Sequence, residues 1–165
     1  EEDIRKWRTY AKVSPPLRNK KNMEAVKIGI SKKVIDCVTS DHSPHDTDSK
    51  RLPFEQASTG IIGFESLLPL TLRLIKSKNL PLSELVELLS HRPAKILNLN
   101  TGNLKKGSPA DLVVFDPSKN IKLSSDLVKS KSKNFPYENI TGKGKVMLTM
   151  VDGKVIYNVR KFNFK

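Results

Sequence analysis

The segment Asp41-His42-Ser43-Pro44-His45 holds the side chains best suited to chemistry. A carboxylate such as that of Asp41 can bind a divalent metal ion, act as a general base, or do both. His45 follows four residues later, behind a turn that a proline stiffens, and can reach the same cavity. An Asp-His pair is also a common turn former and helix cap, so both interpretations stay open. Two histidines and one aspartate do not complete a catalytic zinc site, which needs three or more ligands and room for water.

Two glycines and the remaining histidine are weaker candidates. Gly60 and Gly63 flank an apolar pair in front of an expected helix. They either serve a loop that needs positive φ or close packing, or let backbone N–H and C=O groups contact a small polar substrate. The segment is not a phosphate-binding loop, because the sequence contains no Gly-Lys-Ser or Gly-Lys-Thr. His91 precedes Arg92-Pro93 at the start of an expected helix, so we expect a structural or capping role for it.

The elements that must position these residues can be predicted from hydrophobic spacing. Residues 34–40 are short, apolar and β-branched, which predicts a buried strand directly before Asp41. The strand is apolar on both faces, as in a parallel sheet, and ligands gather at the carboxyl edge of such sheets. Helices are expected over residues 22–30 with Asn22 as N-cap, 66–76 with Pro69 in its first turn, 81–89 with Ser83 as N-cap, and 91–97.

The last third of the chain is predicted to be rich in β-structure. Residues 110–117 form an apolar run that a turn closes. Asp152-Gly153 lies between the alternating runs 145–151 and 154–157, and Asp-Gly in this setting is a strong hairpin signal.

Composition limits the class of protein. A chain of 165 residues with 37% hydrophobic residues can bury the core of one ordinary domain. No apolar run approaches the roughly 18 residues of a membrane span. The charged first residues argue against a secretory signal peptide, and the single cysteine, Cys37, excludes a disulfide framework. We therefore expect a cytoplasmic protein with no membrane partner.

The net charge of +13 suggests nucleic-acid binding, but its distribution argues against it. The basic residues are mostly lysines spread along the chain, in clusters only two residues long such as Lys20-Lys21 and Lys105-Lys106. The few aromatic residues are not interleaved with arginine as a base-stacking surface requires. A solvated, lysine-rich surface is the expected interpretation.

The motifs, taken in order, resemble the dihydroorotases, which are metal-dependent amidohydrolases of pyrimidine synthesis. They cover nearly the whole chain. They are Ser14-Pro15-Pro16-Leu17-Arg18, Asp41-His42-Ser43-Pro44-His45, Lys50-Arg51-Leu52-Pro53-Phe54, Gly60-Ile61-Ile62-Gly63-Phe64-Glu65, Arg92-Pro93-Ala94, residues 107–113, residues 130–137 and Val151-Asp152-Gly153-Lys154.

The resemblance implies a role for each matching residue. Asp41 would bind the metal, for which zinc is the family expectation, and would move a proton between the attacking water and the amide nitrogen. His45 would contact the substrate carboxylate, and the backbone of Thr59 and Gly60 would contact the substrate ring. Ser14 stands where many relatives carry an asparagine that hydrogen-bonds the substrate. The implied reaction is the reversible cyclisation of N-carbamoyl-aspartate to dihydroorotate with loss of water.

The resemblance also implies an α/β fold that is the C-terminal part of an amidohydrolase (β/α)8 TIM barrel with strands of a small β-sandwich domain. Residues 1–103 would supply the last strands and helices of the barrel, and residues 104–165 the β-rich segment. The His-x-His pair with which complete relatives begin does not occur in the sequence. A full barrel takes about 250 residues. We therefore expect this chain to be inactive alone.

Three alternatives remain open at this stage. The chain can associate with a separately encoded N-terminal half, or act as a non-catalytic companion of aspartate transcarbamoylase. Another cyclic amidohydrolase such as an allantoinase is the nearest enzymatic alternative. That family commonly has cysteine where this chain has His45, so His45 favours dihydroorotase.

Overall fold

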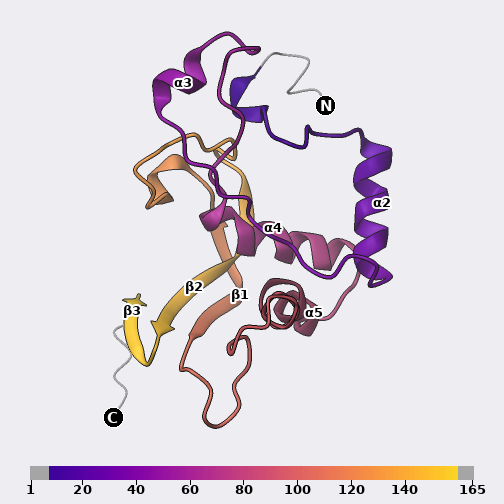
Figure 1. Ribbon diagram of the computed structural model, residues 1–165, viewed down its shortest axis with the longest axis vertical. Coiled ribbons are helices and arrows are strands. Elements are labelled where there is room, and N and C mark those ends of the chain that lie inside the picture. Colours follow the sequence, from indigo (N-terminus) through magenta and orange to yellow (C-terminus); the bar gives the residue numbers. More distant parts are fainter. Residues whose placement is uncertain (1–7, 160–165) are drawn as a thin grey trace.

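The computed structural model describes residues 8–159 and places a helical region before a three-stranded antiparallel sheet (Figure 1). Helix α4 lies between the sheet and helix α2, and it contacts both. The helical elements are η1 (Thr9–Ala11), α2 (Lys20–Ser31), α3 (Thr47–Arg51), α4 (Phe64–Ser77), α5 (Leu82–Val86), the π-helical turn η2 (Glu87–His91), α6 (Arg92–Ile96) and η3 (Ser125–Leu127). The strands are β1 (Leu112–Lys122), β2 (Thr141–Val151) and β3 (Lys154–Asn158).

The predicted helices exist, but their first residues differ from expectation. The N-cap of α2 is Asn19, whose side chain accepts a hydrogen bond from the Asn22 N–H at 3.0 Å, so the prediction of Asn22 as the cap was wrong. Both asparagines suit a cap, and the lysines between them are good helix formers that extend the helix. Helix α4 begins two residues earlier than expected, which places Pro69 in its second turn.

The two helices expected after residue 81 form one continuous helical path. Pro81, not Ser83, is the N-cap of α5, because the Glu84 N–H bonds to the Pro81 carbonyl at 3.0 Å. Between α5 and α6 the path widens into the π-helical turn η2. This turn precedes Pro93, whose ring clashes with the carbonyl four residues earlier in a regular α-helix. The widening therefore lets the helix continue through the proline.

The buried strand predicted over residues 34–40 does not form in the described part of the chain. The segment has irregular backbone and no ladder partner, and Val34 is 74% exposed. A parallel strand takes its hydrogen bonds from neighbouring strands. The described residues provide only one such neighbour, at an isolated parallel bridge between His42 and Ile61. The Val38 N–H instead bonds to the Leu88 carbonyl at 3.1 Å.

The sheet agrees with the pattern of the sequence. Its order is β1-β2-β3, and every pair of neighbours is antiparallel. Strand β2 turns into β3 at Asp152 and Gly153, whose φ angles of 48° and 73° are those of a two-residue hairpin turn, as predicted. Strand β1 extends beyond the expected end at residue 117 to Lys122, with register shifts on the way.

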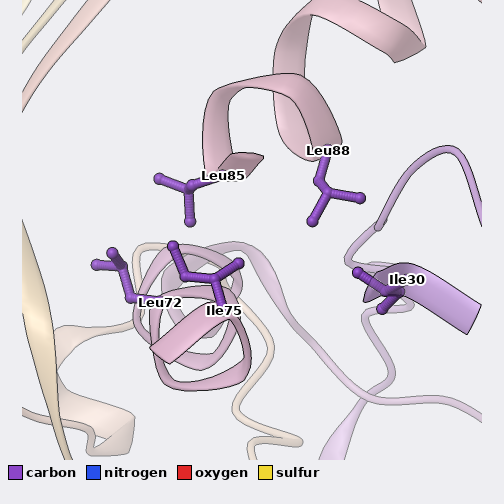
Figure 2. Packing of buried hydrophobic residues seen from close by; sticks show 5 residues of the cluster. All are labelled: Ile30, Leu72, Ile75, Leu85 and Leu88. Carbon is purple, nitrogen blue, oxygen red and sulfur yellow. The ribbon is translucent and has the colours of Figure 1, made fainter. Parts of the chain in front are cut away.

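The helical core joins α4 to three other helical elements. It contains Ile30 of α2, Leu72 and Ile75 of α4, Leu85 of α5 and Leu88 of η2 (Figure 2). Complete burial of such a side chain contributes about 1.5–3 kcal/mol. A second cluster, described below, packs the segment before α4 against the segment that follows β1.

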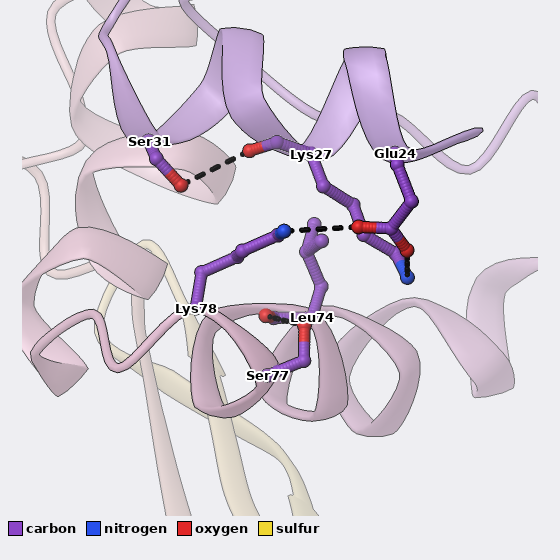
Figure 3. A network of polar contacts seen from close by, with 6 residues as sticks. All are labelled: Glu24, Lys27, Ser31, Leu74, Ser77 and Lys78. Atoms are coloured by element: carbon purple, nitrogen blue, oxygen red, sulfur yellow. Dashed lines mark hydrogen bonds and ion pairs between the residues drawn. The ribbon is translucent and has the colours of Figure 1, made fainter. Parts of the chain in front are cut away.

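Glu24 provides a pH-dependent link between α2 and the end of α4. Its carboxylate lies 2.7 Å from Lys27 Nζ and 2.9 Å from Lys78 Nζ (Figure 3). Hydrogen bonds from Lys27 and Lys78 lower the pKa of Glu24 from 4.5 to about 2. Because the pKa is lower in the folded chain, the link stabilises the fold above pH 4.5 and is lost as the pH falls toward 2.

Replacing Lys78 is expected to raise the pKa of Glu24. In an NMR titration of the side-chain carboxyl, Lys78→Met should move the midpoint from about 2 toward 4.5, because one charged hydrogen-bond donor is lost. Lys76→Met, a change at an exposed lysine on the same helix, should leave it in place. A wild-type midpoint near 4.5 would contradict the link.

Candidate active site

The candidate site forms where the segment around His42 meets the segment before α4. His42 and Ile61 pair as a parallel bridge, and the Ser43 N–H donates to the Ile61 carbonyl at 2.9 Å. The Gly63 N–H donates to His42 Nδ1 at 3.2 Å. The neutral ring therefore carries its proton on Nε2. The ring also stacks on Phe64, with centroids 3.8 Å apart, so His42 is a structural residue of this junction.

Asp41 lies at the exposed edge of the junction. The backbone φ of Asp41 is 43°, which turns the chain sharply, and Asp41 is exposed to solvent. Its carboxylate makes no hydrogen bond or ion pair with another residue between 8 and 159, so this side chain is not used as a turn former or a helix cap there. A left-handed backbone at a residue other than glycine is uncommon, and such conformations cluster at functional sites.

His45 lies beside the loop that holds Thr59 and Gly60. His45 Nε2 is 2.9 Å from the Thr59 carbonyl oxygen. Since a carbonyl only accepts, Nε2 donates this hydrogen bond. Three of the residues identified in the sequence, His45, Thr59 and Gly60, are thus neighbours, and Asp41 precedes His45 on the same turn.

Gly60 and Gly63 are glycines because other backbone and side-chain atoms approach them closely. A Cβ on Gly60 would lie 2.5 Å from Ser43 Cβ and 3.2 Å from His45 Nε2, and its φ is 128°. A Cβ on Gly63 would lie 2.6 Å from the Ser40 carbonyl oxygen. Close packing, one of the two interpretations of this pair, therefore explains both residues, and a positive φ adds to it at Gly60, since the φ of Gly63 is −139°.

A buried lysine, which the sequence analysis missed, fixes the Gly60 loop. Lys50 is 1% exposed, and its Nζ donates to the carbonyls of Ser58 at 2.8 Å and Gly60 at 3.1 Å. Burial, and then the neighbouring charge of Lys12, lower the pKa of Lys50. Lysine is rarely buried, so neither its type nor its spacing indicated this role. The one signal was its place in the Lys50-Arg51-Leu52-Pro53-Phe54 motif.

The segment that contains Ser14 contacts the loop through Lys12. The Gly60 N–H donates to the Lys12 carbonyl at 2.9 Å, and Lys12 Nζ donates to the Phe54 and Glu55 carbonyls. Ser14 itself is exposed, and its hydroxyl bonds to no residue within the described range. The structure therefore does not bring Ser14 into the cluster. His91 Nδ1 lies 3.3 Å from the Gly102 carbonyl, a structural contact, as expected.

The described residues do not assemble a metal site by themselves. Within residues 8–159, no three His, Cys, Asp or Glu side chains gather closely enough to hold an ion, so Asp41 can supply at most one ligand. A hollow of about 1090 Å³ lies between α4 and the β1–β2 pair, and none of the site residues lines it. No helix in the range is long and apolar enough to cross a membrane.

Adding a methyl group at Gly60 is expected to loosen the junction. Gly60→Ala combines a clash at 2.5 Å with an unfavourable φ, and backbone strain of this kind costs about 1–3 kcal/mol. Hydrogen exchange at the Ser43 amide should become faster. Gly107→Ala is the matched control, because Gly107 has a φ of 90° but open space around it. Equal effects of the two substitutions on this amide would show that close approach is not what requires glycine.

Comparisons with known proteins agree with this architecture. Residues 10–156 match the amidohydrolase family. The chain is 42% identical over 157 residues to a dihydroorotase of Geobacter sp. (strain M21), covering 95% of this chain and 37% of the relative. It is 39% identical to a dihydroorotase of Ehrlichia canis (strain Jake), with 95% and 35% covered.

Solved structures give the same result for the fold. The L-hydantoinase (dihydropyrimidinase) of Arthrobacter aurescens superposes with a TM-score of 0.84 at 29% identity, covering 95% of this chain and 36% of that one. The D-hydantoinase (dihydropyrimidinase) of Thermus sp. gives 0.83 at 28% identity, with the same coverage. The chain spans little more than a third of the length of these relatives. The predicted fold class, an α/β part of a larger amidohydrolase barrel, is confirmed, and the chain belongs to the amidohydrolase family.

Proposed function

We propose that this chain supplies part of the active site of a dihydroorotase, which opens dihydroorotate with water to N-carbamoyl-L-aspartate and closes it again. The observation that carries the proposal is the exposed carboxylate of Asp41, which has no partner among residues 8–159 and precedes His45 by four residues on the turn whose histidine bonds to the Thr59 carbonyl. Identity of 39–42% to proteins named dihydroorotase, over about 95% of the chain, supports this substrate over other cyclic amides.

Asp41 acts as the proton carrier in this proposal. Its carboxylate accepts a proton as the water oxygen bonds to the ring carbonyl carbon. It returns that proton to the ring nitrogen as the carbon–nitrogen bond breaks. General acid–base catalysis of this kind contributes about 10²–10⁴-fold to the rate. An exposed carboxylate without a hydrogen-bond partner among residues 8–159 is free to take both roles.

His45 binds the substrate carboxylate in this proposal. Its Nε2 already donates to the Thr59 carbonyl, so Nδ1 is the nitrogen left for a ligand. Nδ1 becomes a donor only in the imidazolium form, because the neutral ring has one N–H.

The loop presents Thr59 rather than Gly60 to the substrate. The Gly60 N–H is bonded to Lys12, and the Gly60 carbonyl already accepts from Lys50. The Thr59 N–H, in contrast, donates to no residue within the described range. We expect this N–H to bind the ring, with Gly60 allowing the close approach. Ser14 stays a proposed substrate contact of the complete enzyme.

The remaining parts of the site come from outside the described residues. The family is metal-dependent in general, and zinc is the metal that the resemblance implies, with Asp41 as one ligand. We propose that residues 8–103 complete a barrel with the two thirds of the relatives that this chain does not span, and that residues 104–159 belong to the β domain. Alone, the chain is inactive. A separately encoded N-terminal half, or aspartate transcarbamoylase, is the proposed partner.

A second candidate is the hydrolysis of another cyclic amide. The solved structures that superpose well include hydantoinases, at up to 29% identity. Hydantoins and allantoin share the ring amide that Asp41 would protonate. Hydantoin and allantoin are therefore assayed beside dihydroorotate as substrates of the chimera.

A chimera tests the proposed function. Residues 8–159 of this chain replace the matching segment of the Geobacter dihydroorotase, which supplies the other two thirds of the enzyme. We expect this chimera to open dihydroorotate, and Asp41→Asn to lower kcat by at least about 10²-fold because the proton carrier is lost. Asp48→Asn, a change at an exposed carboxylate in α3, is the matched control.

Three outcomes would contradict the proposal. Opening of only hydantoin or allantoin would assign the chain to the second candidate. Unchanged turnover in Asp41→Asn would remove its catalytic role. Binding of the natural chain to aspartate transcarbamoylase, with no turnover in the chimera, would favour a non-catalytic companion.

A further inference from the structure

Asn134 is a buried polar residue that comes from a distant part of the sequence. It lies between η3 and β2, is 2% exposed, and is separated from His45 by 89 residues. It belongs to the 130–137 motif, to which the proposed function assigns no role. Buried side-chain amides need partners for both ends, so the contacts of this residue indicate what it does.

The carboxamide of Asn134 joins the two segments of the site. Its Nδ2 donates to the carbonyls of Ser43 at 2.9 Å and Gly60 at 3.2 Å. Its Oδ1 accepts from the His45 N–H at 3.2 Å. The Asn134 main-chain carbonyl also accepts from the Ile62 N–H at 3.3 Å. One residue thus contacts the turn that carries His45 and the loop that carries Gly60.

The chemistry of these contacts selects an amide. Two carbonyls require two donors, and one N–H requires an acceptor, which is the complement of a carboxamide. A flipped amide would place its NH2 group against the His45 N–H and its oxygen against both carbonyls. A carboxylate would keep the acceptor but lose both donors. Aspartate is therefore a near-isosteric substitution that removes two of the three side-chain hydrogen bonds.

Packing holds this amide in place. The next residue, Phe135, is 2% exposed and belongs to the cluster of Ile62, Leu123 and Val128. Lys133 Nζ donates to the Val128 carbonyl at 2.8 Å on the other side. A site is positioned accurately when the residues that support it are themselves fixed by packing and hydrogen bonds.

We propose that Asn134 is a positioning residue of the candidate active site, which fixes His45 relative to the Thr59–Gly60 loop. It touches no substrate, because it is buried beneath both segments. The proposal rests on the proposed function for its effect on catalysis. Its effect on the His45 ring is independent of any activity.

The ring of His45 gives the first test. The hydrogen bond from Nε2 to Thr59 should hold the neutral ring as one tautomer, which ¹⁵N NMR of the full chain with labelled histidine detects. In Asn134→Asp, we expect a mixture of the two tautomers at His45 and an unchanged signal from His42. Asn120→Asp, a change at an exposed asparagine of β1, is the control and should change neither ring. A single Nε2–H tautomer in Asn134→Asp would overturn the proposal.

A double-mutant cycle in the chimera gives the second test. Asn134→Asp should raise KM for dihydroorotate about tenfold, equivalent to 1.4 kcal/mol, with a smaller effect on kcat. In a His45→Gln background the same substitution should change KM less than twofold, because the residue that it positions is absent. Multiplicative losses would show a general structural role and overturn the proposal. If the unsubstituted chimera opens no dihydroorotate, the proposed function fails, and the tautomer measurement alone decides the role of Asn134.

Discussion

The pairing of His42 with Ile61 is the constraint on which the candidate site depends. It brings two segments side by side so closely that only glycine fits at residues 60 and 63. The stacked rings of His42 and Phe64 then join this pairing to the first turn of α4. Because residues of α4 also belong to the helical core, the site is attached to that core.

Main-chain carbonyls, rather than charged partners, hold the loop beside His45. The buried ammonium of Lys50 is compensated by the carbonyl dipoles of Ser58 and Gly60, and its lowered pKa records the cost of burial. An ammonium carries three donors, so one lysine can fix several carbonyls in a loop that has no regular secondary structure. Contacts within the chain therefore order this loop without regular secondary structure.

Local patterns in the sequence predicted the elements whose causes are local. The residue types of Asp152-Gly153 are enough to specify the hairpin turn. The spacing of the apolar residues in α4 is enough to specify a helix, whatever the helix packs against. The segment 34–40 has the composition of a strand, but a strand also needs neighbours, which composition does not supply. The motif residues His45, Thr59 and Gly60 were found from the sequence, and they are in contact.

The supporting residues of the site could not be predicted in this way. The partners of Lys50 and Asn134 are main-chain groups, which nearly every residue carries, and those of Asn134 lie 74, 89 and 91 positions away. No residue type or spacing marks such a pairing. Ser14 is the opposite case. It lies in a motif that the sequence reveals, but it is exposed and makes no hydrogen bond to His45, Thr59 or Gly60.

The reach of Asn134 into the turn that carries His45 has a consequence for how such a protein can change over generations. The side-chain amide of Asn134 joins the stretch that carries the motif to the stretch that carries the sheet, in addition to a main-chain hydrogen bond and the apolar packing between them. A recombination event with its crossover between residues 62 and 134 would replace one of these two stretches and keep the other. The amide of Asn134 and its main-chain partners would then come from different parent proteins. The two stretches therefore form one structural unit, although a long interval of sequence separates them.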